Sequence, residues 1–127
     1  MNPSFLSLLS LASRLRSEKG CPWDRKQTIE SMKNHLEEEA LEVKEAINKE
    51  DYKNLKEELG DLLFQIIMIA QIASEQKIFN MDDVIKNIEN KIISRHTWVF
   101  GSDTALNADH ALDLWEKNKQ KEKESNQ

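Results

Sequence analysis

The stretch "LEEEALEVKEAINKEDYKNLKEELGDLLFQII" (Leu36–Ile67) decides the fold of this chain. Its first half repeats apolar residues at steps of three and four, the period of an amphipathic helix, and its end is almost entirely apolar. We expect one helix from the N-cap Thr28 to about Lys49 and a second from about Asp51 to Gln76. Two antiparallel helices of this kind would bring the charged faces of the stretch together.

Signals outside this stretch predict three further helices. They cover about Ser4–Glu18, ending at the C′ residue Gly20, then a segment that begins near Met81, and about Ala108–Lys121. The segments "GCPWD" (20–24) and "VFGSDTALNADH" (99–110) are expected to be loops, and residues 122–127 a frayed tail. The predicted fold is an all-α helical bundle of about five helices, in a single domain that spans residues 1–127.

Composition excludes several classes of protein. The chain has 127 residues, of which 39% are hydrophobic and 32% charged, as in globular domains. The net charge of -5 and the lack of a basic segment argue against nucleic acid as a partner. The single cysteine, Cys21, excludes an internal disulfide and a multi-cysteine zinc site. We find no targeting segment and no transmembrane segment, and we expect a cytoplasmic protein with no membrane partner.

The apolar half of the second predicted helix carries a prediction about assembly. The segment Leu62–Ala73 is apolar on nearly all sides, and such a helix is buried on several faces. One small domain can hardly bury it alone, so we expect a subunit interface, most simply a two-fold homodimer that completes the core. The alternative is a central helix that is wrapped by its own chain.

A set of acidic residues in the deciding stretch lacks a basic residue one turn away on its own helix: Glu39, Glu42, Glu58 and Asp61. They form two pairs, each spaced by three residues and therefore on one face of its helix. Two interpretations are open, a solvated acidic face or a site for a divalent cation such as Mg²⁺, which prefers oxygen ligands. Gly60 favours the cation, because a glycine inside a helix costs about 1 kcal/mol relative to alanine and permits close approach of a neighbour or ligand.

The same residues carry a resemblance to a known family. Glu38, Glu39 and Glu42 form an "EExxE" pattern, which an "ExxD" pattern at Glu58 and Asp61 follows. "GCPWDRKQT" (20–28), "EELGDLLFQ" (57–65), "RHTWVFG" (95–101) and "LWEKNKQKEK" (114–123) accompany them in this order. Together these segments resemble the signature of MazG-type nucleoside triphosphate pyrophosphohydrolases over nearly the whole chain.

The resemblance implies an all-α enzyme, a dimer or higher homo-oligomer, that hydrolyses nucleoside triphosphates to nucleoside monophosphate and pyrophosphate. It implies Mg²⁺ as cofactor, with Mn²⁺ as a substitute. The metal ligands it implies are Glu39, Glu42, Glu58 and Asp61, and Glu38 would orient or activate water as a further catalytic residue. The residues implied to contact phosphates, and also the nucleoside, are Lys91, Arg95, Trp115 and Lys119.

Several residues keep more than one interpretation. Trp23 is a substrate-binding candidate because it could stack on a base, but it could also plug the end of the bundle. We expect His96 to order the turn after its helix. The chain departs from the family pattern at Ser94, Thr97, Trp98 and Ile69, which bears on substrate preference. A role in cleansing or controlling the nucleotide pool competes with specialisation for dUTP, dCTP or a phosphoribosyl nucleotide, and with a catalytically silent interaction module.

Overall fold

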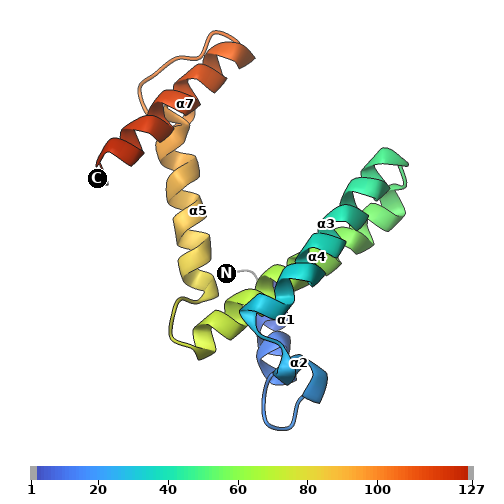
Figure 1. The fold of residues 1–127 in the computed structure, drawn as a ribbon. Helices are drawn as coiled ribbons and strands as arrows, with labels where there is room; N and C mark the ends of the chain where they lie inside the picture. The colour runs from blue at the N-terminus through green and yellow to red at the C-terminus, as the bar shows by residue number, and fades with distance from the viewer. Residues whose placement is uncertain (1–2, 126–127) are drawn as a thin grey trace. The chain divides into compact units, whose positions relative to one another are not determined.

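The computed structural model describes residues 3–125, and every regular element in that range is a helix. The long helices are α1 (Pro3–Leu15), α3 (Ile29–Asn48), α4 (Tyr52–Glu75), α5 (Met81–Arg95) and α7 (Ala108–Ser125), and the short ones are α2 (Pro22–Lys26) and α6 (Thr97–Phe100) (Figure 1). The all-α prediction is confirmed, with two short helices beyond the five expected. The chain forms two compact units, one up to Met81 and one from Asp82 onward. The single domain over residues 1–127 therefore stays a prediction.

Helices α3 and α4 lie side by side and form the main packing contact of the first unit (Figure 1). Thr28 caps α3 as predicted, because its hydroxyl accepts a hydrogen bond from the Ser31 amide at 3.0 Å, and the Ser31 hydroxyl accepts one from the Thr28 amide at 2.8 Å. The Asp51 carboxylate caps α4 by accepting a hydrogen bond from the Asn54 amide at 3.2 Å. Glu50, with φ 54°, supplies the left-handed residue that reverses the chain between the two helices.

The core of the first unit is built by α1, α3 and α4. Its buried residues are Ala12, Met32, Ile67, Met68 and Ile72, and half-buried side chains of α1 and α4 pack against them. The apolar half of α4 is thus covered to a large extent by its own chain, as in the alternative left open above. Some apolar side chains still face solvent, including Ile66 at 39% exposure and Leu59 at 49%.

The "GCPWD" segment is not simply a loop, and this part of the prediction is wrong. Pro22 starts the short helix α2, where its fixed φ suits the first helical position. Helix α1 also ends at Leu15, earlier than the expected Glu18. Gly20 is needed for space rather than for a left-handed C′ conformation, since its φ is not positive and a Cβ there would lie 2.2 Å from the Leu15 carbonyl oxygen.

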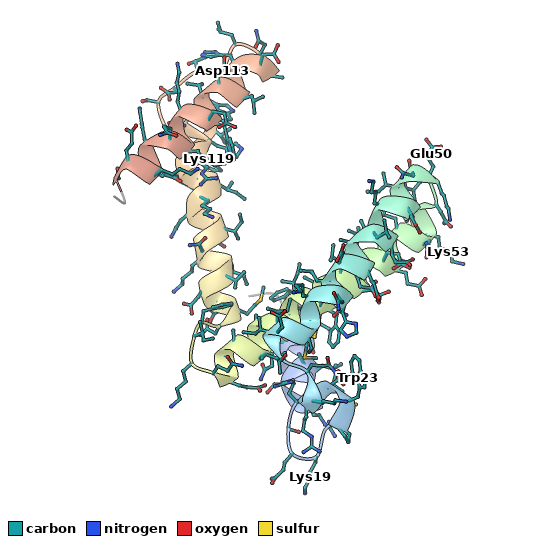
Figure 2. The ribbon with its side chains drawn as sticks, in the orientation of Figure 1. Lys19, Trp23, Glu50, Lys53, Asp113 and Lys119 are labelled. Carbon is teal, nitrogen blue, oxygen red and sulfur yellow. The ribbon has the colours of Figure 1, made fainter. Side chains whose placement is uncertain are left out.

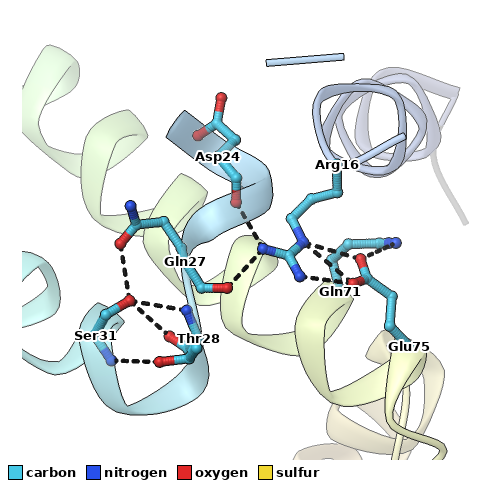
Figure 3. Close-up of polar contacts among 7 residues, drawn as sticks. All are labelled: Arg16, Asp24, Gln27, Thr28, Ser31, Gln71 and Glu75. Carbon is cyan, nitrogen blue, oxygen red and sulfur yellow. Dashed lines mark hydrogen bonds and ion pairs between the residues drawn. The ribbon is translucent and has the colours of Figure 1, made fainter. Parts of the chain in front are cut away.

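One buried guanidinium holds α2 in place. The Arg16 side chain, 9% exposed, donates hydrogen bonds to the backbone carbonyls of Asp24 (2.6 Å) and Gln27 (2.8 Å), and forms an ion pair with Glu75 of α4 at 2.7 Å (Figure 3). The Gln27 side chain is itself buried, donates to the Trp23 carbonyl at 3.0 Å and accepts from the Ser31 hydroxyl at 2.8 Å. This set of bonds, called the Arg16 network below, ties α1, α2, α3 and α4 together.

In the second unit, α7 packs on α6 and continues to Ser125, beyond the predicted end at Lys121. The residues expected to be a frayed tail are therefore helical as far as they are described. Buried Asn118 donates hydrogen bonds to the Arg95 carbonyl and the Thr97 hydroxyl, both at 3.0 Å. His96 orders the turn as predicted, since its Nδ1 lies 2.7 Å from the Ile92 carbonyl, but the expected loop begins later because α6 includes Val99 and Phe100. Within residues 3–125, no helix combines the length and the apolar character needed to cross a bilayer.

Candidate active site

Three of the predicted acidic ligands converge where α3 meets α4. Glu39 of α3 and Glu58 and Asp61 of α4 each offer a carboxylate oxygen, and these oxygens all lie within 4.8 Å of one another. We call these three residues the acidic cluster. The antiparallel packing of two helices that each carry acids three residues apart produces this arrangement, as the sequence predicts.

The electrostatics of the acidic cluster are unfavourable without a counter-charge. Burial raises the pKa of Glu39, and the charges of Asp61 and then Glu42 raise it further. The pKa of Glu58 is likewise raised by burial and then by the charges of Glu42 and Asp61. The ion pairs Arg16–Glu75, Lys33–Glu30 and Arg95–Glu122 involve no residue of the acidic cluster.

The residues present fit a hard divalent cation. The Oε2 atom of Glu39 is closed to solvent and has no hydrogen-bond partner in the described part of the chain. A buried carboxylate oxygen without a partner is costly, and a cation is the natural group to satisfy it. Together with Glu58 and Asp61 it gives an all-oxygen donor set, which suits Mg²⁺ or Mn²⁺ rather than a thiolate-bound or imidazole-bound metal.

The other two acidic candidates border the cluster. Glu42 is exposed and lies outside the group of three, although its charge acts on both Glu39 and Glu58. Glu38 is exposed and contributes a smaller effect on Glu39. A Cβ at Gly60 would meet nothing within 4 Å, so no described segment of the chain makes the close approach that this glycine was expected to allow.

Trp23 is not a plug for the bundle, because its side chain is 54% exposed. It projects from α2, at the opposite end of the α3–α4 pair from Glu50 (Figure 2). Its ring meets the His35 ring edge to face, with centroids 5.4 Å apart and planes inclined by 62°. His35 lies one helical turn before Glu39 on the same face of α3, so the aromatic pair and the acidic cluster share a side of the first unit. Sequence reasoning did not identify His35.

The basic candidates gather in the second unit, around one aromatic ring. Arg95 Cζ of α5 and Lys119 Nζ of α7 each lie 5.1 Å from the Trp115 ring centroid, a cation–π arrangement (Figure 2 labels Lys119). Lys91 is exposed one turn before Arg95 on α5. The acidic cluster belongs to the first unit and these cations belong to the second.

Arg95 already has an anionic partner. Its Nε donates to Glu122 Oε2 at 3.0 Å, and the Ser94 hydroxyl donates to the other oxygen of the same carboxylate. The hydrogen bond from Ser94 lowers the pKa of Glu122 most, and the one from Arg95 lowers it further. The positive charges of Arg95 and Lys91 add to this effect. Ser94, one of the departures from the family pattern, thus helps to build an anion site that a side chain of the chain itself fills. Sequence reasoning missed Glu122, because it is 27 residues away from Arg95 along the chain.

The remaining departures from the family pattern, Thr97, Trp98 and Ile69, make structural contacts. The Thr97 hydroxyl donates to Asp103 at 2.6 Å. Trp98 lies 4.9 Å from the His96 ring and lines a pocket of about 370 Å³ with His96, Ala108, Ala111, Leu112 and Trp115. Ile69 is half-buried against the core of the first unit. The pocket gives the second unit an apolar, aromatic-lined surface beside its cations.

Comparison with known proteins identifies relatives. The family model described as the MazG nucleotide pyrophosphohydrolase domain matches residues 27–100, which include the acidic cluster, Lys91 and Arg95. Trp115 and Lys119 lie beyond the matched range.

The chain is 44% identical over 121 residues to the nucleoside triphosphate pyrophosphohydrolase/pyrophosphatase MazG of Thermotoga maritima, covering 95% of this chain and 48% of that protein. It is 42% identical over 117 residues to the nucleoside triphosphate pyrophosphohydrolase of Escherichia coli, covering 91% of this chain and 44% of that protein. The chain thus spans about half the length of these curated relatives. A crystal structure of a mazG-related protein from Thermotoga maritima superimposes with a TM-score of 0.75 at 31% identity, covering 91% of this chain and 98% of that one.

Proposed function

This chain belongs to the MazG nucleotide pyrophosphohydrolase family, and from that membership we propose that it hydrolyses nucleoside triphosphates to nucleoside monophosphate and pyrophosphate. The reaction would serve cleansing or control of the nucleotide pool. The observation that carries the proposal is the acidic cluster with the unpartnered Oε2 atom of Glu39. A solvated acidic face would not close one of its oxygens to water.

Glu39, Glu58 and Asp61 would hold Mg²⁺, with Glu42 completing the ligand set. When bound, Mg²⁺ offsets the negative charge of the phosphates and acidifies a coordinated water. The cluster's own contribution is to present carboxylate oxygens in fixed positions, since both helices are capped and packed on a common core. Precise positioning of this kind is the main protein contribution to phosphoryl transfer.

We propose that Glu38 acts as the general base and accepts the proton of the attacking water. It neighbours the cluster on α3 and is exposed, so its carboxylate can accept a proton. The water oxygen forms a bond to the α-phosphorus, and the bond from that phosphorus to the bridging oxygen breaks. Pyrophosphate leaves with the bridging oxygen, and the water proton passes to Glu38.

We propose that the phosphate oxygens of the substrate are bound by Lys91, Arg95 and Lys119. Arg95 can bind an oxyanion with its fork of donors, and Trp115 orients both Arg95 and Lys119 through its ring. Glu122 supports this assignment, because a carboxylate bound to Arg95 stands in for a phosphate oxygen. A phosphate that takes the Nε donor of Arg95 must displace Glu122.

Glu122→Gln is therefore expected to lower KM for a nucleoside triphosphate several-fold, since the neutral amide competes less well for Arg95 than the carboxylate. The same change removes a partly exposed ion pair, so Tm should fall only slightly. Steady-state kinetics with ATP, beside thermal unfolding, measures both effects. Glu124→Gln, an exposed site on the same helix, is the matched control. A lower Tm with an unchanged KM would mean that the Glu122 contact is structural only.

We further propose that a second copy of this chain covers the apolar face of α5. This helix buries none of its residues, and Ile88 and Ile92 on one face are 50% and 46% exposed. A helix of 15 residues with an unburied apolar face is marginal by itself, because most helix stability in proteins comes from packing that face. A two-fold pair would supply the missing cover. It would be a homodimer, as expected from the sequence, but through α5 rather than through the apolar half of α4, where Ile67 is buried by its own chain.

Ile92→Glu is expected to convert the dimer to a monomer, because it places a charge in the centre of the proposed apolar interface. Sedimentation velocity measures the change in mass directly. Asn90→Glu, on the opposite side of α5, adds the same charge and should leave the dimer intact. Equal sedimentation of wild type and Ile92→Glu, both folded, would exclude this interface.

The proposed reaction is tested by incubating the pure chain with a panel of ribo- and deoxyribonucleoside triphosphates and Mg²⁺ and resolving the products. Nucleoside monophosphate with pyrophosphate is the expected result. Nucleoside diphosphate with phosphate would place cleavage at the wrong bond. A strong preference for dUTP or dCTP would favour a specialised enzyme over one with a broad cleansing role, and absence of any turnover would favour an interaction module.

A further inference from the structure

The three tryptophans of the chain differ in how much of each ring is free. Trp115 is half-buried and has two cations on its ring, and Trp98 is half-buried beside His96. Trp23 is 54% exposed and meets His35 edge to face. An exposed indole ring keeps apolar surface free for contact with another aromatic group. Trp23 is therefore the tryptophan that is available to a flat ligand.

Trp23 is also held more firmly than an exposed side chain on a five-residue helix would otherwise be. The Arg16 network holds α2 at several points. Arg16 donates to the Asp24 and Gln27 carbonyls (Figure 3). The Gln27 side chain donates to the carbonyl of Trp23 itself. Arg16 and Gln27 are largely buried, so solvent does not compete for these bonds. A platform that is fixed before the ligand arrives loses little conformational entropy on binding.

The location of the pair relates it to the acidic cluster. His35 and Glu39 are four residues apart on α3, so their side chains are neighbours along one face of the helix. A nucleotide whose phosphates lie at the cluster would extend its sugar and base along the surface of the unit. In the aromatic pair, Trp23 offers a nucleobase an exposed π-face, and His35 offers imidazole nitrogens that can hydrogen-bond to the edge of the base.

We propose that Trp23 and His35 form the nucleobase subsite, with Trp23 stacking on the base and His35 bonding to its edge. This inference rests on the proposed function, since it concerns the same substrate. Stacking on an aromatic ring tolerates every base because each has a π-face, so Trp23 supplies affinity and His35 supplies the preference among bases. The substrate class is a nucleotide with an intact base, purines being bound more tightly because their stacking area is larger.

The test compares two probes that differ in the base. One is the α,β-methylene analogue of ATP, which resists the proposed cleavage, and the other is inorganic tripolyphosphate, which has no base. Binding of each to the full chain with Mg²⁺ is measured by calorimetry. Trp23→Ala is expected to weaken binding of the analogue by roughly 5- to 150-fold, which is the loss that follows removal of one stacking partner. The affinity for tripolyphosphate should stay unchanged.

Two further variants separate stacking from packing. Trp23→Phe should recover most of the affinity, whereas Trp23→Leu, which keeps apolar bulk but has no π-face, should not. Tyr52→Ala removes another aromatic side chain of the first unit, which is 67% exposed, and should change the affinity for neither probe. Far-ultraviolet circular dichroism verifies that each variant is folded, and Trp23→Phe and Trp23→Leu decide the matter if the alanine variant is not.

The outcomes divide clearly. Equal weakening of both probes, or no weakening of either, overturns the subsite. Full affinity of Trp23→Leu for the analogue also overturns it, because packing alone would then suffice. Trp23-dependent binding of the analogue without turnover of any triphosphate would refute the proposed reaction and leave the base subsite standing.

Discussion

Replacing Asp61 by asparagine is expected to lower kcat for nucleoside triphosphate hydrolysis by at least about a thousandfold, or about 4 kcal/mol of transition-state stabilisation. Asp61 supplies one of the three converging oxygens, and an amide has half the oxygen donors and no charge with which to hold a cation. The substitution is isosteric and removes repulsion from Glu39 and Glu58, so the helical fold should persist. Single-turnover and steady-state product analysis measure the loss, and circular dichroism the fold.

Glu42→Gln sharpens the same prediction. Glu42 is outside the group of three but acts on it electrostatically, so we expect its variant to lose turnover at low Mg²⁺ and to regain part of it as Mg²⁺ is raised. Asp61→Asn should not be rescued in this way. Glu45→Gln, an exposed acid of α3 beyond the cluster, is the control and should keep the wild-type rate. Undiminished rates in both Asp61→Asn and Glu42→Gln would refute the assignment of these carboxylates as metal ligands.

The acidic cluster could be predicted from the sequence because its cause is local. Helical period places Glu58 and Asp61 on one face, and the short turn after α3 brings that face against Glu39. The absence of a basic residue one turn away then indicates that the counter-charge must come from elsewhere. The convergence of three of the four acids is observed, and their role as ligands stays a prediction.

The Arg16 network could not be predicted, because it joins residues without any periodic relation. Arg16 and Glu75 are 59 residues apart, and the two carbonyls that Arg16 also binds carry no sequence signal at all. These bonds explain why the segment "CPWD", expected to be a loop, contains the start of helix α2 and why the backbone of Trp23 is held in place. Local reasoning sees the residue types of such a segment but not the distant side chain that fixes it.

The second unit illustrates a different limit. The family resemblance implies that Arg95 and Lys119 contact phosphate, and the alternative for each is a solvated surface charge. The structure instead places a carboxylate on Arg95 and an aromatic ring beneath both cations. Glu122 lies in a segment that looked like a frayed tail, since a run of alternating charges with no apolar face predicts little order. The order of that segment comes from Ser94 and Arg95, which bind Glu122.

Mg²⁺ is expected to stabilise the wild-type chain near neutral pH by about 2.7 kcal/mol at a hundred times its Kd, because the folded state alone assembles the acidic cluster. For a chain of this size that corresponds to a rise in Tm of roughly 10 °C. Thermal unfolding followed by circular dichroism, with and without the ion and after chelation, measures it. Asp61→Asn should lose most of the increment, whereas Glu37→Gln, an exposed acid of α3 outside the cluster, should keep it.

The pH dependence of this increment follows from the raised pKa values of Glu39 and Glu58. A carboxyl whose pKa is higher in the folded state binds more protons there than in the unfolded chain, so without metal its contribution to stability is fully present below the ordinary pKa of 4.5 and is lost as pH rises through the folded value. Protons and Mg²⁺ compete for the same oxygens, so the ion restores stability only where the carboxyls are ionised. The Mg²⁺ increment in Tm should therefore grow from near zero below pH 4.5 to its full size near neutrality. An increment that is already complete at the acid end, or that survives intact in Asp61→Asn, would mean that Mg²⁺ stabilises the chain at some site other than the acidic cluster.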